Sequence, residues 1–261
     1  MNTKTMLAIS ALCAAVAANA EISSANIVGY GPTTLPADGL SVGPSFVTMS
    51  ASGVYDLMDV SVVGYDDSSL GDVQVQTLTG SGGTDKTYAW FDYVDDESGD
   101  RIKGWFDPDH DYEPLERGVV TIAVGEGLWS VTMASGLSLQ TAGQVATDAD
   151  IPLALPADGL TIANPTPVEV DLFDCYVNGY DEVSLGDVQA QTLTGSGGTD
   201  KTYAWFDYVD DESGDHIYGW FDPDHDYEPL EEDSVTVAPG EGLWSVTMAN
   251  GLNFVWPKVD L

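Results

Sequence analysis

Two segments of this chain, residues 69–116 and 184–231, carry nearly the same 48-residue text. They differ at only three positions, Val75/Ala190, Arg101/His216 and Lys103/Tyr218. The hexapeptide at residues 35–40 also recurs at residues 155–160. The copies are offset by 115 residues in the long segment and by 120 in the hexapeptide, which is the length of a domain and exceeds the unit of a solenoid. The repeat therefore predicts two tandem homologous domains.

The positions of the repeats set the expected domain boundaries. A first domain with an N-terminal strand is predicted for residues 21–140, and a second for residues 153–261. Residues 141–152 between them are rich in Ala, Thr and Asp, which is typical of a linker. Because 43% of the residues are hydrophobic, each copy is expected to bury a core of its own.

Both copies consist of short runs of β-branched and aromatic residues separated by Gly, Asp and Ser. This pattern predicts strands joined by turns. In residues 87–94, apolar side chains occupy both alternating sets of positions, as expected for a strand that is covered on both faces. The predicted fold class is all-β, with two β-sandwich-like or small β-barrel domains.

The first twenty residues are organised like a secretory signal peptide. Lys4 precedes an apolar run, residues 6–17, and Ala18-Asn19-Ala20 forms a small-x-small cleavage site before Glu21. The apolar run is shorter than the roughly 20 residues that a transmembrane helix needs. Residues 1–20 therefore predict export to the periplasm, the extracellular space or the cell surface, and no later segment is expected to insert into a membrane.

A large negative charge limits the partners of the exported chain. The sequence has 43 acidic and 7 basic side chains, for a net charge of -36. Such a chain repels nucleic acid and anionic membranes, whereas cations, basic proteins and neutral glycans remain compatible partners. Only Cys175 follows the predicted cleavage site, so no intrachain disulfide is expected.

Carboxylates occupy every second position of the segment 107–113, and the spacing recurs at 222–228. Oxygen ligands at this density suit calcium, which takes about six to eight of them with flexible geometry. The segment is not a standard EF-hand, because Tyr112 stands where that loop needs Gly and Gly118 where it needs Glu. A structural calcium site is one interpretation, and a solvated, salt-tolerant surface is the other. The predicted ligands are Asp107, Asp109, Asp111, Glu113, Asp222, Asp224, Asp226 and Glu228.

Aromatic residues alternate with these acids in both copies. Exposed rings beside carboxylates form the kind of surface on which sugar rings stack. The candidate ligand-binding residues are Trp90, Trp105, Trp205 and Trp220. Core packing is the alternative, because most tryptophans in a domain of this size are buried.

The sequence shows no recognisable catalytic motif. Residues 80–87 resemble a phosphate-binding loop only superficially, because Asp85 stands where Gly must admit the phosphate. His110, His216 and His225 have no identifiable paired nucleophile. We therefore predict a non-enzymatic exported or cell-surface structural or interaction protein that binds a glycan or another surface protein, or assembles with itself. A tandem carbohydrate-binding module is the alternative, and duplication would make a weak site bivalent in either case.

Four short motifs carry a resemblance to a known group of proteins. They are Ser-Ala-Asn-Ile-Val-Gly-Tyr at 24–30, Gln-Val-Gln-Thr-Leu at 74–78, Gly-Glu-Gly-Leu-Trp at 125–129 and Leu-Gln-Thr-Ala-Gly-Gln-Val at 139–145. In these motifs the chain resembles uncharacterised exported bacterial proteins that bear a signal peptide and two β-rich copies. The resemblance implies export and a β-rich fold. Because the group has no assigned activity, it implies no functional residues.

Overall fold

The computed structural model describes residues 28–35, 40–42, 54–65, 73–79, 83–132, 136–144, 149–156, 160–180, 188–194, 198–247 and 251–258. The predicted signal peptide, residues 1–20, lies outside these stretches. Within the described stretches, no helix has the length and apolar character needed to cross a bilayer.

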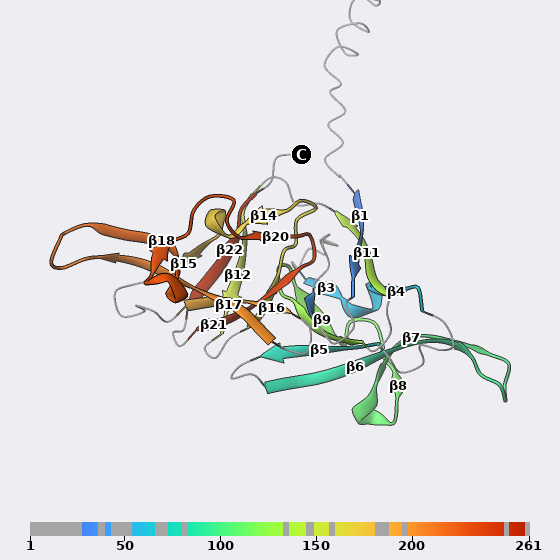
Figure 1. The fold of residues 1–261 in the computed structure, drawn as a ribbon. Coiled ribbons are helices and arrows are strands. Elements are labelled where there is room, and N and C mark those ends of the chain that lie inside the picture. The colour runs from blue at the N-terminus through green and yellow to red at the C-terminus, as the bar shows by residue number, and fades with distance from the viewer. Residues whose placement is uncertain are drawn as a thin grey trace, which may run out of the picture.

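The described residues form an all-β structure with a few 3-10 turns (Figure 1). The strands of the first half are β1 (Val28–Thr34), β2 (Leu40–Val42), β3 (Val54–Asp56), β4 (Ser61–Val63), β5 (Val73–Thr79), β6 (Gly83–Val94), β7 (Arg101–Asp107), β8 (Glu113–Pro114), β9 (Thr121–Ala123), β10 (Leu128–Thr132) and β11 (Ser138–Gln144). Those of the second half are β12 (Ile151–Leu155), β13 (Leu160–Ala163), β14 (Val170–Asp171), β15 (Tyr176–Asn178), β16 (Val188–Thr194), β17 (Gly198–Val209), β18 (His216–Asp222), β19 (Glu228–Pro229), β20 (Thr236–Val237), β21 (Gly242–Thr247) and β22 (Leu252–Trp256). The 3-10 turns are η1 (Leu57–Asp59), η3 (Pro108–His110), η4 (Leu172–Asp174) and η6 (Pro223–His225).

One long antiparallel sheet contains strands from both halves of the chain. Its order is β19-β18-β17-β16-β21-β13-β5-β6-β7-β8, and β10 joins it by pairing with β5 and β2. The smaller sheets are β1-β11-β4, β12-β22-β15, β3-β9 and β14-β20. The all-β prediction is confirmed. The small-barrel alternative is not, since none of the sheets formed by the described residues closes on itself.

The two copies of the repeated text form the same hairpins in the same register. Strand β5 pairs with β6, and β16 with β17, with an irregularity after Thr77 and at the equivalent Thr192. Strands β6 and β7 place Trp90 opposite Trp105, and β17 and β18 repeat this pair in the second copy. The β6–β7 and β17–β18 hairpins project from opposite ends of the molecule (Figure 1).

A buried core lies between the long sheet and each three-stranded sheet. In the first half, Trp90 and Trp105 of the long sheet share a core with Val62 and Leu139 of the sheet β1-β11-β4. The core of the second half combines the long sheet with β12-β22-β15 through Trp205, Trp220, Leu153, Val177 and Phe254. Two sheets enclosing apolar side chains in this way form a sandwich-like arrangement.

Strand β13 joins the two halves. Leu160 pairs with Thr79 of β5, and Ile162 forms an antiparallel bridge with Glu126 of the first half. The Gly127 N–H donates to the Thr161 carbonyl at 2.8 Å, next to that bridge. The predicted linker, residues 141–152, begins within β11 and ends within β12, and its residues 145–148 lie outside the described stretches.

Candidate functional site

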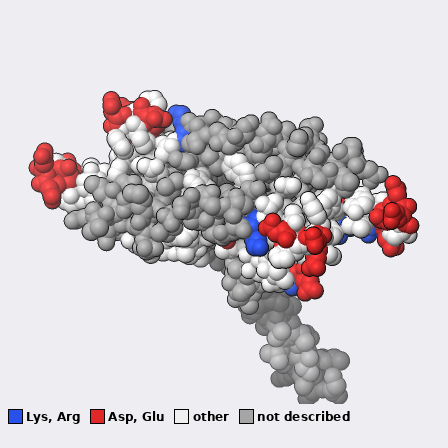
Figure 2. Space-filling model, turned by 90° about the horizontal axis from the view of Figure 1, so that it is seen from below, with Lys and Arg blue, Asp and Glu red and all other residues white. Residues whose placement is uncertain are grey.

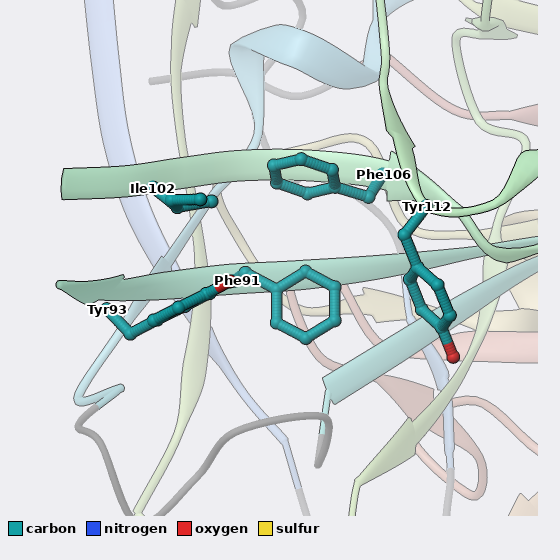
Figure 3. Close-up of a pocket in the computed structure, with 5 residues that line it drawn as sticks. All are labelled: Phe91, Tyr93, Ile102, Phe106 and Tyr112. Atoms are coloured by element: carbon teal, nitrogen blue, oxygen red, sulfur yellow. The ribbon is translucent and has the colours of Figure 1, made fainter. Parts of the chain in front are cut away.

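The β6–β7 hairpin has two faces of different composition. Side chains alternate between the two sides of a strand, so Trp90 and Trp105 share one side of the hairpin. These two residues belong to the core. Phe91, Tyr93 and Phe106 lie on the opposite side, where their rings gather beside that of Tyr112 (Figure 3).

The four tryptophans named as candidate sugar-binding residues lie in the cores, in agreement with the core-packing alternative. Trp90, Trp105, Trp205 and Trp220 expose 4%, 1%, 1% and 2% of their surface. The rings of each pair meet edge to face with centroids 5.3 Å apart. The Trp105 Nε1–H donates to the Val60 carbonyl at 2.7 Å, and the Trp220 Nε1–H donates to the Cys175 carbonyl at 2.8 Å. Rings enclosed in this way have no free face on which a sugar can stack.

The acidic segment 107–113 begins with a capped 3-10 turn, η3. Asp107 Oδ1 accepts from the Asp109 N–H at 2.9 Å, and Asp107 Oδ2 lies 2.8 Å from His110 Nδ1. Pro108 fits the first position of the turn, where its fixed φ is suitable and no N–H is needed. The hydrogen bond with His110 holds the pKa of Asp107 below its usual value. Both oxygens of Asp107 are therefore engaged within the segment.

The second copy repeats this capped turn. Asp222 Oδ1 accepts from the Asp224 N–H at 2.9 Å, and Asp222 Oδ2 lies 2.7 Å from His225 Nδ1. Burial raises the pKa of Asp222, but the hydrogen bonds with His225 and Asp224 outweigh it, so the pKa lies below its usual value. The capping Asp and the following His are thus the side chains that meet in both copies.

The predicted calcium ligands do not gather into a cluster. The described residues hold no group of three or more His, Cys, Asp and Glu side chains that could bind a metal ion. Of the eight predicted ligands, Asp107 and Asp222 act as caps, whereas the other six are exposed: Asp109, Asp111, Glu113, Asp224, Asp226 and Glu228. Calcium binding stays a prediction.

The backbone after η3 reverses direction through an uncommon conformation. Asp111 and Tyr112 have φ values of 51° and 57°, and their counterparts Asp226 and Tyr227 have 53° and 58°. A bulky residue rarely adopts this left-handed region, and the cost is on the order of 1–3 kcal/mol per residue. The reversal brings the Tyr112 ring to Phe91, with centroids 5.7 Å apart.

The rings on the outer side of the hairpin surround an open hollow of about 230 Å³ (Figure 3). Phe91 lies at the centre, with centroid distances of 6.1 Å to Tyr93 and 5.3 Å to Phe106. Gly104 pairs with Phe91 across the ladder, and a Cβ at Gly104 would meet no atom within 4 Å, so the hollow stays open there. The lining residues, which we call the first aromatic face, are Phe91, Tyr93, Ile102, Phe106 and Tyr112.

The second copy repeats the ring geometry. Phe206 lies 6.0 Å from Tyr208, 5.3 Å from Phe221 and 5.8 Å from Tyr227, measured between ring centroids. The second aromatic face comprises Phe206, Tyr208, Ile217, Phe221 and Tyr227. The sequence analysis names the four tryptophans as candidate ligand-binding residues and neither aromatic face. The available signal was alternation, which places Phe91 and Tyr93 on the side opposite Trp90.

Two of the three differences between the copies lie on the tryptophan side of the hairpin. In the first copy, Arg101 Nε lies 2.8 Å and Lys103 Nζ 3.1 Å from the Asp92 carboxylate, and the hydrogen bond with Arg101 holds the pKa of Asp92 below its usual value. In the second copy, His216 replaces Arg101, and its Nε2 lies 2.8 Å from the Asp207 carboxylate. Tyr218 replaces Lys103 and packs on the buried Trp205 ring. These exchanges leave the aromatic faces unchanged.

Carboxylates flank both ends of each aromatic face. The turn at residues 95–100 adjoins the Tyr93 end of the first face, and residues 109–113 surround Tyr112. Figure 2 shows acidic side chains at both extremities of the molecule, where the two hairpins lie in Figure 1. Lys86 and Lys103 alternate onto the tryptophan side. Each aromatic face is therefore a cluster of rings with acidic residues at both ends, and the first face encloses the hollow described above.

Comparison with known proteins identifies no relative. No protein-family model, curated protein or solved structure matches this chain. Its function therefore has to be inferred from the geometry and chemistry of the site.

Proposed function

We propose that this chain is a non-enzymatic, exported or cell-surface interaction protein that binds its partners through the two aromatic faces. The observation that carries the proposal is the partly exposed cluster of rings around Phe91, which recurs around Phe206. Apolar patches of this kind, rimmed by polar residues, mark interaction sites on protein surfaces. Aromatic residues are enriched at such interfaces.

Backbone strain gives the proposal independent support. Tyr112 and Tyr227 complete the two faces from left-handed backbone positions. Uncommon conformations of this type tend to persist at functional sites, because the surrounding structure offsets their cost. The organisation of residues 1–20 as a signal peptide supports the exported location.

The strand order suggests that the two faces engage separate partners. Six strand-to-strand steps separate the middle of the β17–β18 hairpin from the middle of the β6–β7 hairpin. At about 4.8 Å per step, the faces lie roughly 29 Å apart along the sheet. The hairpins also project in opposite directions (Figure 1), so the protein is suited to bridging two partners.

A tandem carbohydrate-binding module is the second candidate. Tyr112 exposes 51% of its surface beside the hollow, and Tyr227 exposes 54%. A tyrosine ring can stack on a sugar while its hydroxyl and nearby carboxylates bind the sugar hydroxyls. In this version of the proposal, the glycan binds at the aromatic faces and not at the buried tryptophans.

Removing one ring from each face tests whether the faces bind anything. The double variant Tyr112→Asn/Tyr227→Asn keeps the charge, and Asn tolerates the left-handed backbone at both positions. The chain lacking residues 1–20 is immobilised and exposed to a lysine-containing peptide, an acidic peptide and soluble neutral glucans and mannans. We expect at least one basic or neutral ligand to bind, and the double variant to lose most of that binding.

The matched control is Phe173→Asn, because Phe173 is an exposed ring in η4, outside both aromatic faces. This variant should bind like the unmodified chain. If no ligand distinguishes the double variant from the unmodified chain, the aromatic faces are not the binding surfaces and the proposal fails.

A further inference from the structure

We infer that each aromatic face receives a cationic side chain, Lys or Arg, from a basic segment of a partner polypeptide. This inference rests on the proposed function and names the class of its ligand. Three observations carry it: the arrangement of the rings, the distribution of charge around them, and the way in which the two copies differ.

The rings form a receptor suited to a cation. The electron-rich face of an aromatic ring attracts an ammonium or guanidinium group within about 6 Å of its centroid. Tyr93, Phe106 and Tyr112 pack edge to face against Phe91, with centroids 5.3 to 6.1 Å apart. A cation would therefore approach this packed cluster from the open side of the hollow, where more than one ring lies within reach. The protein makes the same kind of contact on the other side of the hairpin, where Lys103 Nζ lies 5.9 Å from the Trp90 centroid.

The size of the hollow fits a side chain better than a larger ligand. Its volume of about 230 Å³ is below the range of roughly 300–1,000 Å³ that is typical of small-molecule sites. Gly104 leaves one side open, so a long side chain can enter from a peptide that lies across the hairpin.

The charge around the faces complements a basic partner. Carboxylates flank each face at both ends, and the cations of β6 and β7 alternate onto the tryptophan side. The Lys103 ammonium and the Arg101 guanidinium are already paired with Asp92. An acidic partner would be repelled, and a neutral glycan would gain nothing from this field.

The two copies provide a comparison built into the chain. Residues 69–116 contain 12 acidic and 3 basic side chains, which gives a net charge of -9. Residues 184–231 contain 12 acidic side chains and 1 basic side chain, which gives a net charge of -11. The two lost cations correspond to His216 and Tyr218, and the rings are the same in both copies. A cationic ligand should therefore prefer the second face, and a neutral ligand should not distinguish the two. Because salt screens charges beyond about 8–10 Å, we expect a preference of roughly twofold to fivefold.

The test uses a fluorescent eight-residue peptide that alternates Lys with Ser. In an extended peptide, alternate side chains point to the same side, about 6.8 Å apart, so several can reach one face of the hairpin. An otherwise identical peptide with acetylated lysines has nearly the same shape without the charge. Fluorescence anisotropy measures the binding of both peptides to the chain lacking residues 1–20.

Single variants separate the two faces. Tyr112→Asn leaves the second face intact, and Tyr227→Asn leaves the first. We expect the Lys peptide to bind Tyr112→Asn about twofold to fivefold more tightly than Tyr227→Asn at physiological salt. We also expect the double variant to bind about threefold to tenfold more weakly than the unmodified chain, since each lost cation–ring contact reduces affinity several-fold. The acetylated peptide should show no ring-dependent binding.

An exchange variant tests the role of charge directly. In the Tyr112→Asn background, His216→Arg with Tyr218→Lys restores the two cations on the tryptophan side of the β17–β18 hairpin, opposite the second face, without altering the rings of that face. The affinity of that face for the Lys peptide should fall to that of the first face. Thermal unfolding of every variant checks that the fold is retained.

Each remaining outcome gives a decision. Equal binding of the Lys peptide to the double variant and the unmodified chain would show attraction to acidic surfaces in general and overturn the inference. Equal affinity of the two faces for the peptide would also overturn it. Ring-dependent binding of a neutral glycan without binding of the Lys peptide would overturn the inference while upholding the proposed function. Loss of ring dependence for every ligand would overturn both.

Discussion

Replacing Trp105 by Phe should destabilise the protein more than replacing Trp90 by Phe, although both rings are buried and in contact. The Trp105 Nε1–H donates to the Val60 carbonyl, whereas the Trp90 Nε1–H has no hydrogen-bond partner within the described part of the chain. The same substitution thus removes a hydrogen bond at one position and an unsatisfied polar group at the other.

The expected difference follows from these two environments. Both substitutions shrink an indole to a phenyl ring, so their packing losses are similar and largely cancel. Trp105→Phe also leaves the Val60 carbonyl without this donor, which costs about 1–3 kcal/mol. Trp90→Phe removes a buried N–H that is already unsatisfied, which offsets part of its packing loss. We therefore expect Trp105→Phe to be more destabilising by about 2 kcal/mol, or roughly 4–8 °C in Tm for a chain of this size.

Urea and thermal unfolding, followed by circular dichroism, measure this difference. The second copy supplies an independent pair, because Trp220 donates to the Cys175 carbonyl and Trp205 Nε1 lacks a partner among the described residues. Trp220→Phe should likewise be more destabilising than Trp205→Phe. Equal destabilisation within both pairs would refute the hydrogen-bond reasoning. Loss of ligand binding with unchanged stability would identify the tryptophans as binding platforms and refute their assignment to the core.

Three further predictions concern the acidic turn, a buried acid and the junction between the halves. If the predicted calcium site forms, calcium should raise Tm more than magnesium at equal ionic strength, and Asp107→Asn should reduce that rise. A calcium effect no larger than that of magnesium would favour the solvated acidic surface, in which Asp107 keeps its hydrogen bonds with Asp109 and His110. Burial raises the pKa of Glu126 in the folded state, so the stability of the protein should fall as pH rises from the unfolded pKa through the folded pKa. Glu126→Gln can still accept from the Ala123 N–H and should reduce this loss of stability. Tm measurements between pH 4 and 7 check this expectation. Gly127→Ala should destabilise the junction by about 1–3 kcal/mol, because its Cβ would lie 2.6 Å from Thr161 Cγ2. Thr161→Ala removes that methyl group and should recover part of the loss in the double variant; strictly additive effects in urea unfolding would contradict the predicted clash.

Local sequence chemistry was sufficient to predict several parts of the structure. The β-branched and aromatic runs between Gly, Asp and Ser predicted an all-β fold, because these residue types favour extended backbone and turns respectively. The repeated text predicted equivalent structures, and β5–β8 and β16–β19 do pair in the same registers. These features depend on interactions between residues close in sequence. Because both copies contain nearly the same residues, both form the same local interactions.

The identity of the binding surface could not be read in the same way. Apolar residues occupy both faces of residues 87–94, so alternation divides Trp90 from Phe91 without showing which of them is buried. The sheet β1-β11-β4 decides this by packing against the tryptophan side, and its strands come from distant parts of the chain. Phe91 is left on the outer side for the same reason.

The sequence by itself determined the all-β class, the equivalence of the repeated segments and their density of acids, since residue type and spacing act locally. Only the tertiary structure decided where the carboxylates point and which rings remain accessible. The Asp107 carboxylate caps η3 by accepting from the Asp109 N–H, so the regular spacing of acids does not become a cluster of ligands. The left-handed backbone at Tyr112 brings its ring to the aromatic face. Strand β13 likewise joins both halves in one sheet through backbone hydrogen bonds. Every residue type except Pro offers the same backbone donor and acceptor, so this pairing leaves little signal in the sequence.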